Sequence, residues 1–385
     1  MFHLKILHIG KYYHPETGGI ESVTRDISEY SAKKGYDVTV LCFASGDLPK
    51  NELINDVSVI RHPVVLNIFS QPINRSYFMW IIKFVRNFDV VHVHFPNIIA
   101  LFALLFIPNA KKIIVHWHSD IIDKGILGFL ITPIENLILR RCNLVITTSM
   151  EYASASKPLR KFRSKISVVP IGIKDPVNTS EIVKSYPVDK LLKKNSALPI
   201  HHKKIILAVG RLVNYKGFDV LIEAASSLPT DCAIIIVGTG PQKTALLDKI
   251  TKNKLEDKVF LLGTVDAETL ELLYRVSYIF CLPSTTRAEA FGVVLLEALS
   301  HGLPIVSTNI TGSGVGWVNQ HSKTGLTVPV NQPRALADAI IKLLENPSLH
   351  KKLGKHCRLR FISTFEHNLC NQRIVKLYEK LMRQY

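Results

Sequence analysis

The chain has 385 residues, of which 47% are hydrophobic and 21% are charged. This length and composition exclude a disordered chain, a collagen-like fibre and a small disulfide-rich scaffold, and they allow two α/β domains. The formal net charge of +17 suits an anionic partner such as a phosphorylated small molecule, an anionic lipid headgroup or a nucleic acid.

The first residues of the chain predict a strand rather than a signal peptide. The longest apolar run, residues 98–107, is too short to span a bilayer. The six cysteines include no C-x-x-C pair, so we expect buried thiols in a reducing compartment. These features predict a cytoplasmic protein, free or peripheral to a membrane.

Short runs rich in valine and isoleucine alternate with helical stretches through the first half of the chain. The strand candidates are residues 5–10, 37–42, 57–62, 90–95, 112–118, 144–149 and 166–170. Most are continuously apolar, which is typical of strands buried on both faces of a parallel sheet. Residues 20–34 carry apolar side chains at helical spacing and stop at Gly35. This order predicts an open parallel sheet covered by helices on both faces.

The composition becomes polar and lysine-rich between about residues 175 and 203, after which the alternation restarts. The strand candidates there are residues 205–210, 233–238, 259–263, 278–283, 304–308 and 325–329. We therefore expect two doubly wound, Rossmann-like α/β domains, residues 1–185 and 186–365, with a final helix at 366–385 that packs back toward the first domain. Ligands of open α/β sheets bind at the carboxyl ends of strands, so two such domains facing each other would form a cleft with two half-sites.

Glycines follow several of the predicted strands. Gly18 and Gly19 begin the first helix, where free amides and the positive end of the helix dipole favour an anion. An ordinary strand-to-helix turn is the alternative. Gly238 and Gly240 in V-G-T-G-P, and Val265 in L-G-T-V, occupy turns that would admit a flat nucleobase.

Two cations follow the first strand of the second domain, in the segment G-R-L-V-N-Y-K-G. From this place Arg211 and Lys216 could hold a diphosphate, the arginine through paired hydrogen bonds and the lysine as a point charge. Two solvated surface cations are the alternative interpretation.

The most informative segment is residues 287–304, R-A-E-A-F-G-V-V-L-L-E-A-L-S-H-G-L-P. Glu289 is expected in a loop after a strand, and Glu297 on the helix that begins after Phe291 and Gly292. The two carboxylates would flank the helix N-terminal amides, giving a phosphate site with hydroxyl acceptors on either side, as a sugar nucleotide needs. Two surface glutamates are the alternative.

Five segments occur in the order found in glycosyltransferase family 4, which the chain resembles over essentially its whole length. They are T-G-G-I-E (17–21), H-W-H-S-D (116–120), G-R-L-V-N-Y-K-G (210–217), V-G-T-G-P (237–241) and E-A-F-G-V-V-L-L-E (289–297). T-T-S (147–149) and V-V-P-I-G-I (168–173) are similar to bacterial O-antigen hexosyltransferases, particularly a mannosyltransferase group. Ala290 stands where many members have glycine, so the resemblance does not identify the transferred sugar.

The resemblance implies a retaining enzyme of the two-domain GT-B fold. It would move a hexose from GDP-mannose or a UDP-hexose to a saccharide acceptor, expected to be lipid-linked, in lipopolysaccharide O-antigen or other surface polysaccharide synthesis. Such an enzyme would work at the cytoplasmic face of the inner membrane.

The resemblance also implies which residues hold the donor. Arg211 and Lys216 would bind the diphosphate, with Gly18 and Gly19 bordering it from the first domain. Glu297 would bind the ribose hydroxyls.

The reacting sugar would be held by other residues. By the same resemblance, Glu289 and the amides of Phe291 to Val293 would bind the transferred sugar. His118 would lie at the reacting centre, close to that sugar, and Asp120 is a candidate contact for the acceptor.

We expect the acceptor to attack from the face that the diphosphate leaves, because both glutamates would be engaged with donor hydroxyls. Arg211, Lys216 and helix amides would stabilise the leaving group. There is no D-x-D motif, so we expect no metal and no other cofactor. His92, His94, His116 and His118 alternate along strands and are interpreted as packed histidines rather than metal ligands.

Residues 77–86 and 157–165 combine apolar or aromatic side chains with cations, which suits an anionic membrane surface. A core helix and a solvated basic helix are the alternatives. A sugar-nucleotide epimerase of the same fold is the alternative activity. No nucleic acid is expected as a partner, because the basic residues do not concentrate on one helix.

Overall fold

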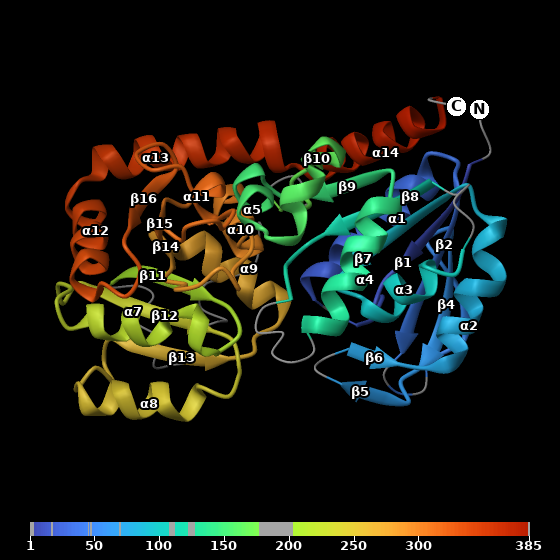
Figure 1. The fold of residues 1–385 in the computed structure, drawn as a ribbon. Coiled ribbons are helices and arrows are strands. Elements are labelled where there is room, and N and C mark those ends of the chain that lie inside the picture. The colour runs from blue at the N-terminus through green and yellow to red at the C-terminus, as the bar shows by residue number, and fades with distance from the viewer. Residues whose placement is uncertain are drawn as a thin grey trace. The chain divides into compact units, whose positions relative to one another are not determined.

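The computed structural model describes residues 4–383 except 17, 45, 47, 69–70, 108–111, 122–127 and 177–202. The chain forms two compact units (Figure 1). The first unit comprises Met1–Gly172 and His367–Tyr385, and the second comprises Ile173–Glu366. The chain therefore leaves the first unit earlier than the sequence suggested, and the expected boundary between residues 185 and 186 lies outside the described residues.

The first unit contains an eight-stranded sheet in the order β10-β9-β8-β7-β1-β2-β4-β3. Its strands are β1 (Lys5–Ile9), β2 (Asp37–Ala44), β3 (Asn51–Ile54), β4 (Val57–Pro63), β7 (Val90–Phe95), β8 (Lys112–Trp117), β9 (Leu144–Thr147) and β10 (Ile166–Val168), beside a hairpin of β5 (Leu66–Ile68) and β6 (Gln71–Ile73). All seven expected strands are present and pair in parallel, and β3 adds an antiparallel edge.

Helices cover this sheet, and the last helix of the chain is one of them. They are α1 (Gly19–Lys33), α2 (Arg75–Phe84), α3 (Ile98–Leu104), α4 (Gly128–Arg141), α5 (Met150–Ala155) and α14 (His367–Arg383). Ile374 and Tyr378 of α14 are buried in the same apolar cluster as Val23 and Ile27 of α1. The C-terminal helix is thus part of the first unit's core.

The second unit contains a six-stranded parallel sheet in the order β13-β12-β11-β14-β15-β16. Its strands are β11 (Lys204–Val209), β12 (Cys232–Val237), β13 (Val259–Gly263), β14 (Ile279–Leu282), β15 (Ile305–Thr308) and β16 (Gly325–Val328). Its helices are α7 (Phe218–Ala225), α8 (Lys243–Lys252), α9 (Ala267–Val276), α10 (Val293–Ser300), α11 (Val315–Val318), α12 (Pro333–Glu345) and α13 (Pro347–Arg360). The six expected strands are all present.

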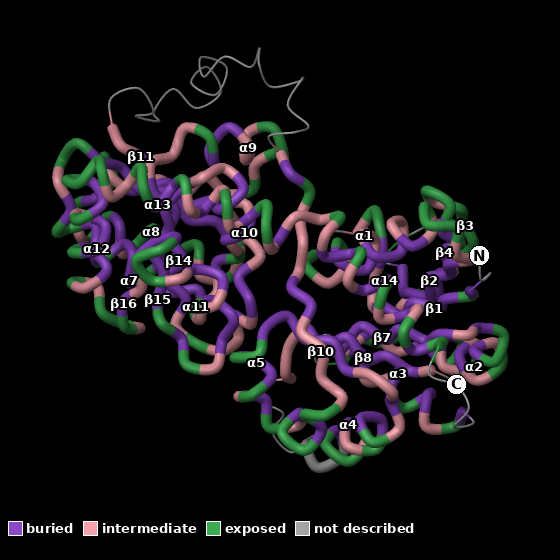
Figure 2. The backbone as a smooth tube through the Cα atoms, turned by 90° about the horizontal axis from the view of Figure 1, so that it is seen from above, coloured by how far each residue is buried: buried purple, intermediate pink, exposed green. Residues whose placement is uncertain are grey.

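The strands form the buried layer of each unit, and exposed residues concentrate on the helices and loops (Figure 2). This burial explains why the strands are continuously apolar in sequence. All six cysteines are buried, as expected, and none forms a disulfide with another described residue. Among the described residues, no helix combines the length and apolarity needed to cross a membrane.

In each sheet the strand order reverses beside the first strand of the unit. The reversal lies between β1 and β7 in the first unit and between β11 and β14 in the second. Loops that leave the carboxyl ends of such strands diverge to opposite faces and open a crevice, which is where doubly wound sheets bind ligands.

Candidate functional site

The second unit brings two predicted site residues together at its strand-order reversal. Lys216 ends a 3-10 turn, Asn214–Lys216, in the loop after β11, and Glu289 lies in the loop after β14. Lys216 Nζ lies 2.6 Å from Glu289 Oε2, and both residues are buried. Ser284 Oγ donates a second hydrogen bond to the same oxygen at 2.9 Å. The site thus places an ammonium and a carboxylate at the carboxyl edge, with restricted access to water.

Backbone contacts hold the two loops in register. The amide of Thr285 donates to the carbonyl of Tyr215 at 2.7 Å, so the loops meet directly. Gly217 has a φ of 67°, and a Cβ there would lie 2.2 Å from the carbonyl oxygen of Pro283. Glycine is therefore required for the two loops to approach this closely.

Gly238 and Gly240 border the loop after β11. A Cβ on Gly238 would lie 1.9 Å from the carbonyl oxygen of Gly210, and one on Gly240 would lie 2.4 Å from that of Leu212. These glycines let the turn after β12 pack against the backbone after β11. Val265, also predicted to border the ligand, is half-buried just after β13.

Arg211 follows β11 directly and is exposed. Among the described residues, the structure gives its guanidinium no hydrogen bond or ion pair. Its five N–H donors are therefore open to a ligand. Lys216 differs, because its ammonium is already paired with Glu289.

Glu297 lies on α10, whose N-cap is Gly292 with a φ of 78°. Its Oε2 accepts a hydrogen bond from the hydroxyl of Tyr274 on α9 at 2.5 Å. Burial raises the pKa of the Glu297 carboxyl, and the hydrogen bond from Tyr274 opposes that rise. The side chain of Phe291 is buried near Trp317, so only its backbone is placed to meet a ligand.

In the first unit, Gly18 and Gly19 form the start of α1 and are exposed, as the sequence suggested. The carboxylate of Glu21 lies beside them, since a Cβ on Gly18 would be 2.2 Å from Glu21 Oε2. Lys11 is close by, and burial lowers the pKa of its ammonium to about 8 while the charge of Glu21 raises it. A carboxylate and an ammonium therefore lie at the start of this helix, beside its free backbone amides.

Asp120 follows β8 and is held firmly by its neighbours. Its Oδ1 accepts hydrogen bonds from Trp117 Nε1 at 2.9 Å and from Ser156 Oγ at 2.6 Å. Its backbone amide donates to the hydroxyl of Tyr152 at 2.6 Å. These contacts fix the loop after β8, and a role toward the acceptor stays a prediction.

His118 follows β8 and belongs to a group of buried histidines. The group comprises His8, His92, His94, His116 and His118. Register places His8 beside His92 and His94 beside His116, on neighbouring strands of the sheet. Two trios of these residues each bring ring nitrogens within 4.8 Å of one another, close enough to surround a metal ion, so independence from metal stays a prediction.

Three residues that bind the predicted site residues were not themselves predicted from the sequence. Ser284 follows a buried strand and lies five positions before Glu289, and that placement was a usable signal. Ser313 donates its hydroxyl proton to the Glu289 carbonyl, and Tyr274 binds Glu297. Neither residue lies in a recognisable motif, because each approaches from a distant segment.

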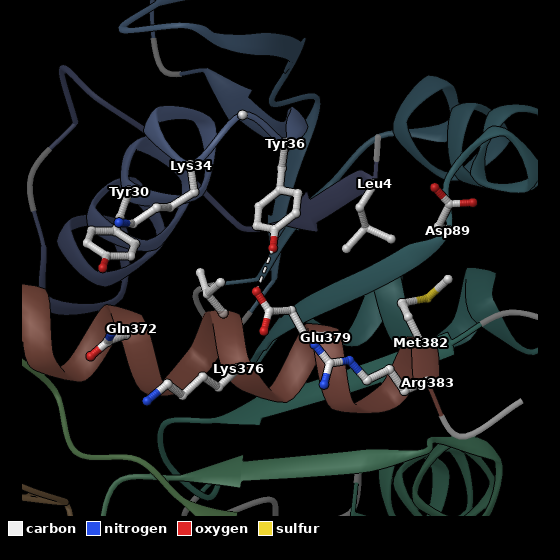
Figure 3. A pocket seen from close by; sticks show the side chains of 12 residues that line it. Leu4, Tyr30, Lys34, Tyr36, Asp89, Gln372, Lys376, Glu379, Met382 and Arg383 are labelled. Atoms are coloured by element: carbon white, nitrogen blue, oxygen red, sulfur yellow. Dashed lines mark hydrogen bonds between the residues drawn. The ribbon is translucent and has the colours of Figure 1, made fainter. Parts of the chain in front are cut away.

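A separate pocket opens in the first unit, at the amino ends of the strands. It lies between α1 and α14, and its lining includes Leu4, Tyr36 and Asp89, which directly precede β1, β2 and β7 (Figure 3). Tyr36 points toward α14 and donates its hydroxyl proton to Glu379 Oε1 at 3.0 Å. This pocket is at the amino ends of the strands, away from the carboxyl edge that carries His118.

The chain is similar to known proteins along its whole length. Residues 17–175 match the family described as Glycosyltransferase Family 4, and residues 189–360 match Glycosyl transferases group 1. D-rhamnosyltransferase WbpZ of Pseudomonas aeruginosa is 32% identical over 364 residues, covering 94% of this chain and 92% of that protein. O-antigen chain mannosyltransferase C of Escherichia coli is 27% identical, covering 98% and 99%. Anabaena HepE, solved with UDP, has a TM-score of 0.77 at 19% identity, covering 98% of this chain and 100% of that one.

Proposed function

The chain belongs to glycosyltransferase family 4, and from that membership we propose that it transfers a hexose from a nucleotide-diphosphate sugar with retention of configuration. It is a glycosyltransferase of the GT-B type. The donor that we propose is GDP-mannose or a UDP-hexose, and the acceptor is a lipid-linked saccharide of O-antigen or another surface polysaccharide. The names of the rhamnosyl- and mannosyltransferase relatives, and the UDP bound by the Anabaena protein, support this proposal.

The observation that carries the proposal is the Lys216–Glu289 pair at the strand-order reversal of the second sheet. An ammonium has three N–H donors, so Lys216 can keep its bond to Glu289 while it donates to a phosphate oxygen. Arg211, exposed beside it, would complete the diphosphate site. Glu289 would then lie next to the phosphate-linked sugar, and Glu297 would bind the ribose.

The proposed transfer proceeds on one face of the sugar. The bond from the anomeric carbon to the diphosphate oxygen breaks, and its electron pair stays on the diphosphate. The acceptor oxygen bonds to the same face, and its proton passes to the leaving diphosphate. Arg211, Lys216 and the amides at the start of α10 would stabilise the developing negative charge, and Glu289 the positive charge on the sugar.

We also propose that the first unit meets an anionic membrane surface to reach the acceptor. Along α2, Tyr77 and Ile81 are buried, whereas Met79 and Lys83 are exposed. Phe106 after α3 is 57% exposed. The predicted segment 77–86 is thus a core helix on one side and an apolar, basic surface on the other, which supports an interfacial site.

Arg211 gives the clearest test of the donor site, because its substitution breaks no hydrogen bond or ion pair of the guanidinium within the described residues. Arg211→Ala should weaken binding of GDP or UDP by about 10- to 150-fold, since a charge-assisted hydrogen bond contributes roughly 1.5–3 kcal/mol. Calorimetric titration of both nucleotides measures this change. Lys252→Ala, which removes an exposed cation at the end of α8, is the matched control. Equal affinities in the wild type and Arg211→Ala would remove the diphosphate assignment.

Transfer should persist in excess EDTA, because the proposed site supplies its own cations for the leaving group. The measurement is release of nucleoside diphosphate with a lipid-linked acceptor, with and without chelator. Activity that is lost in EDTA and restored by Mg²⁺ or Mn²⁺ would refute the proposed charge stabilisation.

A further inference from the structure

The buried histidines of the first unit form one continuous hydrogen-bonded chain, completed by a tyrosine of the C-terminal helix. We name it the histidine chain, and in order it consists of His118, His94, His8, Tyr378, His92 and His116. It starts at His118 just after β8, crosses β7 to β1, passes to α14, and returns through β7 to β8. Every member is buried.

The first half of the chain leads from His118 to the tyrosine. His118 Nε2 lies 3.0 Å from His94 Nδ1, and His94 Nε2 lies 3.0 Å from His8 Nδ1. His8 Nε2 is 3.5 Å from the hydroxyl of Tyr378. Adjacent histidine rings are stacked, with centroids of His94 and His118 5.3 Å apart, and the ring of Tyr378 meets that of His8 edge-on, so packing also fixes their orientations.

The second half leads from the tyrosine to His116. The hydroxyl of Tyr378 is 2.6 Å from His92 Nδ1, and His92 Nε2 is 3.3 Å from His116 Nδ1. Two ring nitrogens of the five histidines, His118 Nδ1 and His116 Nε2, have no hydrogen-bond partner among the residues that the structure describes, and both are buried. These two atoms are the ends of the chain.

All five imidazoles are neutral near pH 7. Burial lowers the pKa of His8 and of His118 to about 3, and it lowers the pKa of the other three well below the usual value. A neutral imidazole has one N–H and one lone pair, and the tyrosine has one O–H. Six groups therefore share six protons, and the five bonds between them use five. The sixth proton lies at one end of the chain, or on Tyr378 if its oxygen accepts from both neighbouring histidines.

Two arrangements satisfy every bond and also use the tyrosine proton, whereas a third, in which Tyr378 accepts from both His8 and His92, leaves its buried O–H without an acceptor and is disfavoured. In the first of the two, each histidine carries its proton on Nε2, all bonds point from His118 toward His116, and His118 Nδ1 is a free acceptor. In the other, each histidine carries its proton on Nδ1, and His118 Nδ1 is a free donor. The Nε2–H form is the more stable tautomer of a neutral histidine side chain. All five rings have this form in the first arrangement, which is therefore the favoured one.

We propose that the histidine chain fixes His118 as a hydrogen-bond acceptor through Nδ1, so that it receives a hydroxyl proton of the substrate, and that Tyr378 is a positioning residue for it. The direction of every bond depends on every other, so the tautomer of His118 is set by residues on three other elements. The inference rests on the proposed function only in placing a substrate hydroxyl at His118. The tautomer itself is independent of any activity.

Tyr378→Phe is the decisive variant, because it removes the one oxygen that joins the two halves. His118, His94 and His8 then share three protons over two bonds. The free proton can lie on His8 Nε2, facing an apolar ring, or on His118 Nδ1, so His118 should acquire a Nδ1–H population. Tyr36→Phe is the matched control, because Tyr36 also binds α14 through its hydroxyl but lies outside the histidine chain (Figure 3).

Nitrogen NMR of ¹⁵N-histidine-labelled protein reports each tautomer directly. We expect uniform Nε2–H signals for the five buried rings in the wild type and in Tyr36→Phe, and a shifted His118 signal in Tyr378→Phe. Turnover of Tyr378→Phe should fall roughly tenfold, the worth of one hydrogen bond, with the KM for the nucleotide sugar little changed.

Mixed tautomers in the wild type, or an unchanged His118 signal in Tyr378→Phe, would overturn the proposal. An altered signal with full turnover would also overturn it, because His118 would then not act as an acceptor in the reaction. If the wild type transferred no sugar, the proposed function would fail instead, and the NMR result would still decide whether the chain fixes the tautomer.

Discussion

Glu289→Gln should lower turnover by on the order of 100-fold and leave the affinity for the nucleoside diphosphate nearly unchanged. The carboxylate is proposed to face the anomeric carbon, where positive charge develops only as the reaction proceeds. Interactions that strengthen in the transition state act on turnover rather than on binding, and one preorganised electrostatic contact is typically worth this much. Steady-state kinetics and calorimetry with GDP or UDP measure the two quantities separately.

Glu297→Gln is the matched comparison, because it makes the same chemical change eight residues along the chain. It should weaken binding of the nucleoside diphosphate and of the nucleotide sugar alike, since both contain the ribose. Gln keeps an oxygen for the Tyr274 hydroxyl, so stability should hold. Equal losses of diphosphate affinity in both variants would show that the two carboxylates do not bind different parts of the nucleotide sugar.

Stability must be followed in the Glu289 variant, because its partner is buried. Removing one member of a buried ion pair leaves the other charge uncompensated, at a cost of about 3–5 kcal/mol. Lys216→Met combined with Glu289→Gln should recover most of that stability. Because Lys216 is itself proposed to bind the diphosphate, the double variant reports on stability alone, and turnover is compared for Glu289→Gln at a temperature where that single variant stays folded.

Lowering the pH from 7 to 5 should destabilise the first unit by several kcal/mol. The five imidazoles of the histidine chain have a pKa below the unfolded value near 6.5, about 3 for His8 and His118. The unfolded state therefore binds protons below pH 6.5 that the folded state does not. Stability is fully present above that pH and is lost as the pH falls toward 3, by at most about 1.4 kcal/mol per pH unit for each histidine.

The three tryptophans allow this loss to be assigned. Trp80 and Trp117 lie in the first unit, and Trp317 lies in the second. Urea denaturation of a variant that retains only Trp117 should show a midpoint that falls steeply between pH 7 and 5, whereas one that retains only Trp317 should change less. Parallel midpoints for the two reporters, or no change for Trp117, would refute the acid lability of the histidine chain.

Much of the fold follows from the sequence because parallel strands buried on both faces must be continuously apolar. The segments missed were β3 and the hairpin of β5 and β6, which are short and largely exposed. The chain passes from the first unit to the second at Gly172, just before the polar, lysine-rich stretch, whereas the sequence predicts the boundary within that stretch. Apolar periodicity in a sequence indicates which residues are buried. It does not predict exposed edge strands or the place where the chain crosses between units.

The site was predictable in residue type but not in pairing. The sequence placed Glu289 in a loop and Glu297 on a helix, as the structure does. The contact of Lys216 with Glu289 joins residues more than seventy positions apart, and it depends on β11 lying beside β14. The histidine chain needs strand order in the same way. Alternation puts His92 and His94 on one face, but only the register beside β1 adds His8.

The most direct test of the donor site is a crystal structure of the protein with a 2-fluoro nucleotide sugar that it cannot transfer, carrying GDP or UDP according to which binds more tightly. We expect diphosphate oxygens within about 3 Å of the Arg211 guanidinium and Lys216 Nζ, with sugar hydroxyls on Glu289 and ribose hydroxyls on Glu297. A nucleotide sugar seated away from the carboxyl ends of β11 and β14, in contact with none of these four side chains, would contradict this expectation.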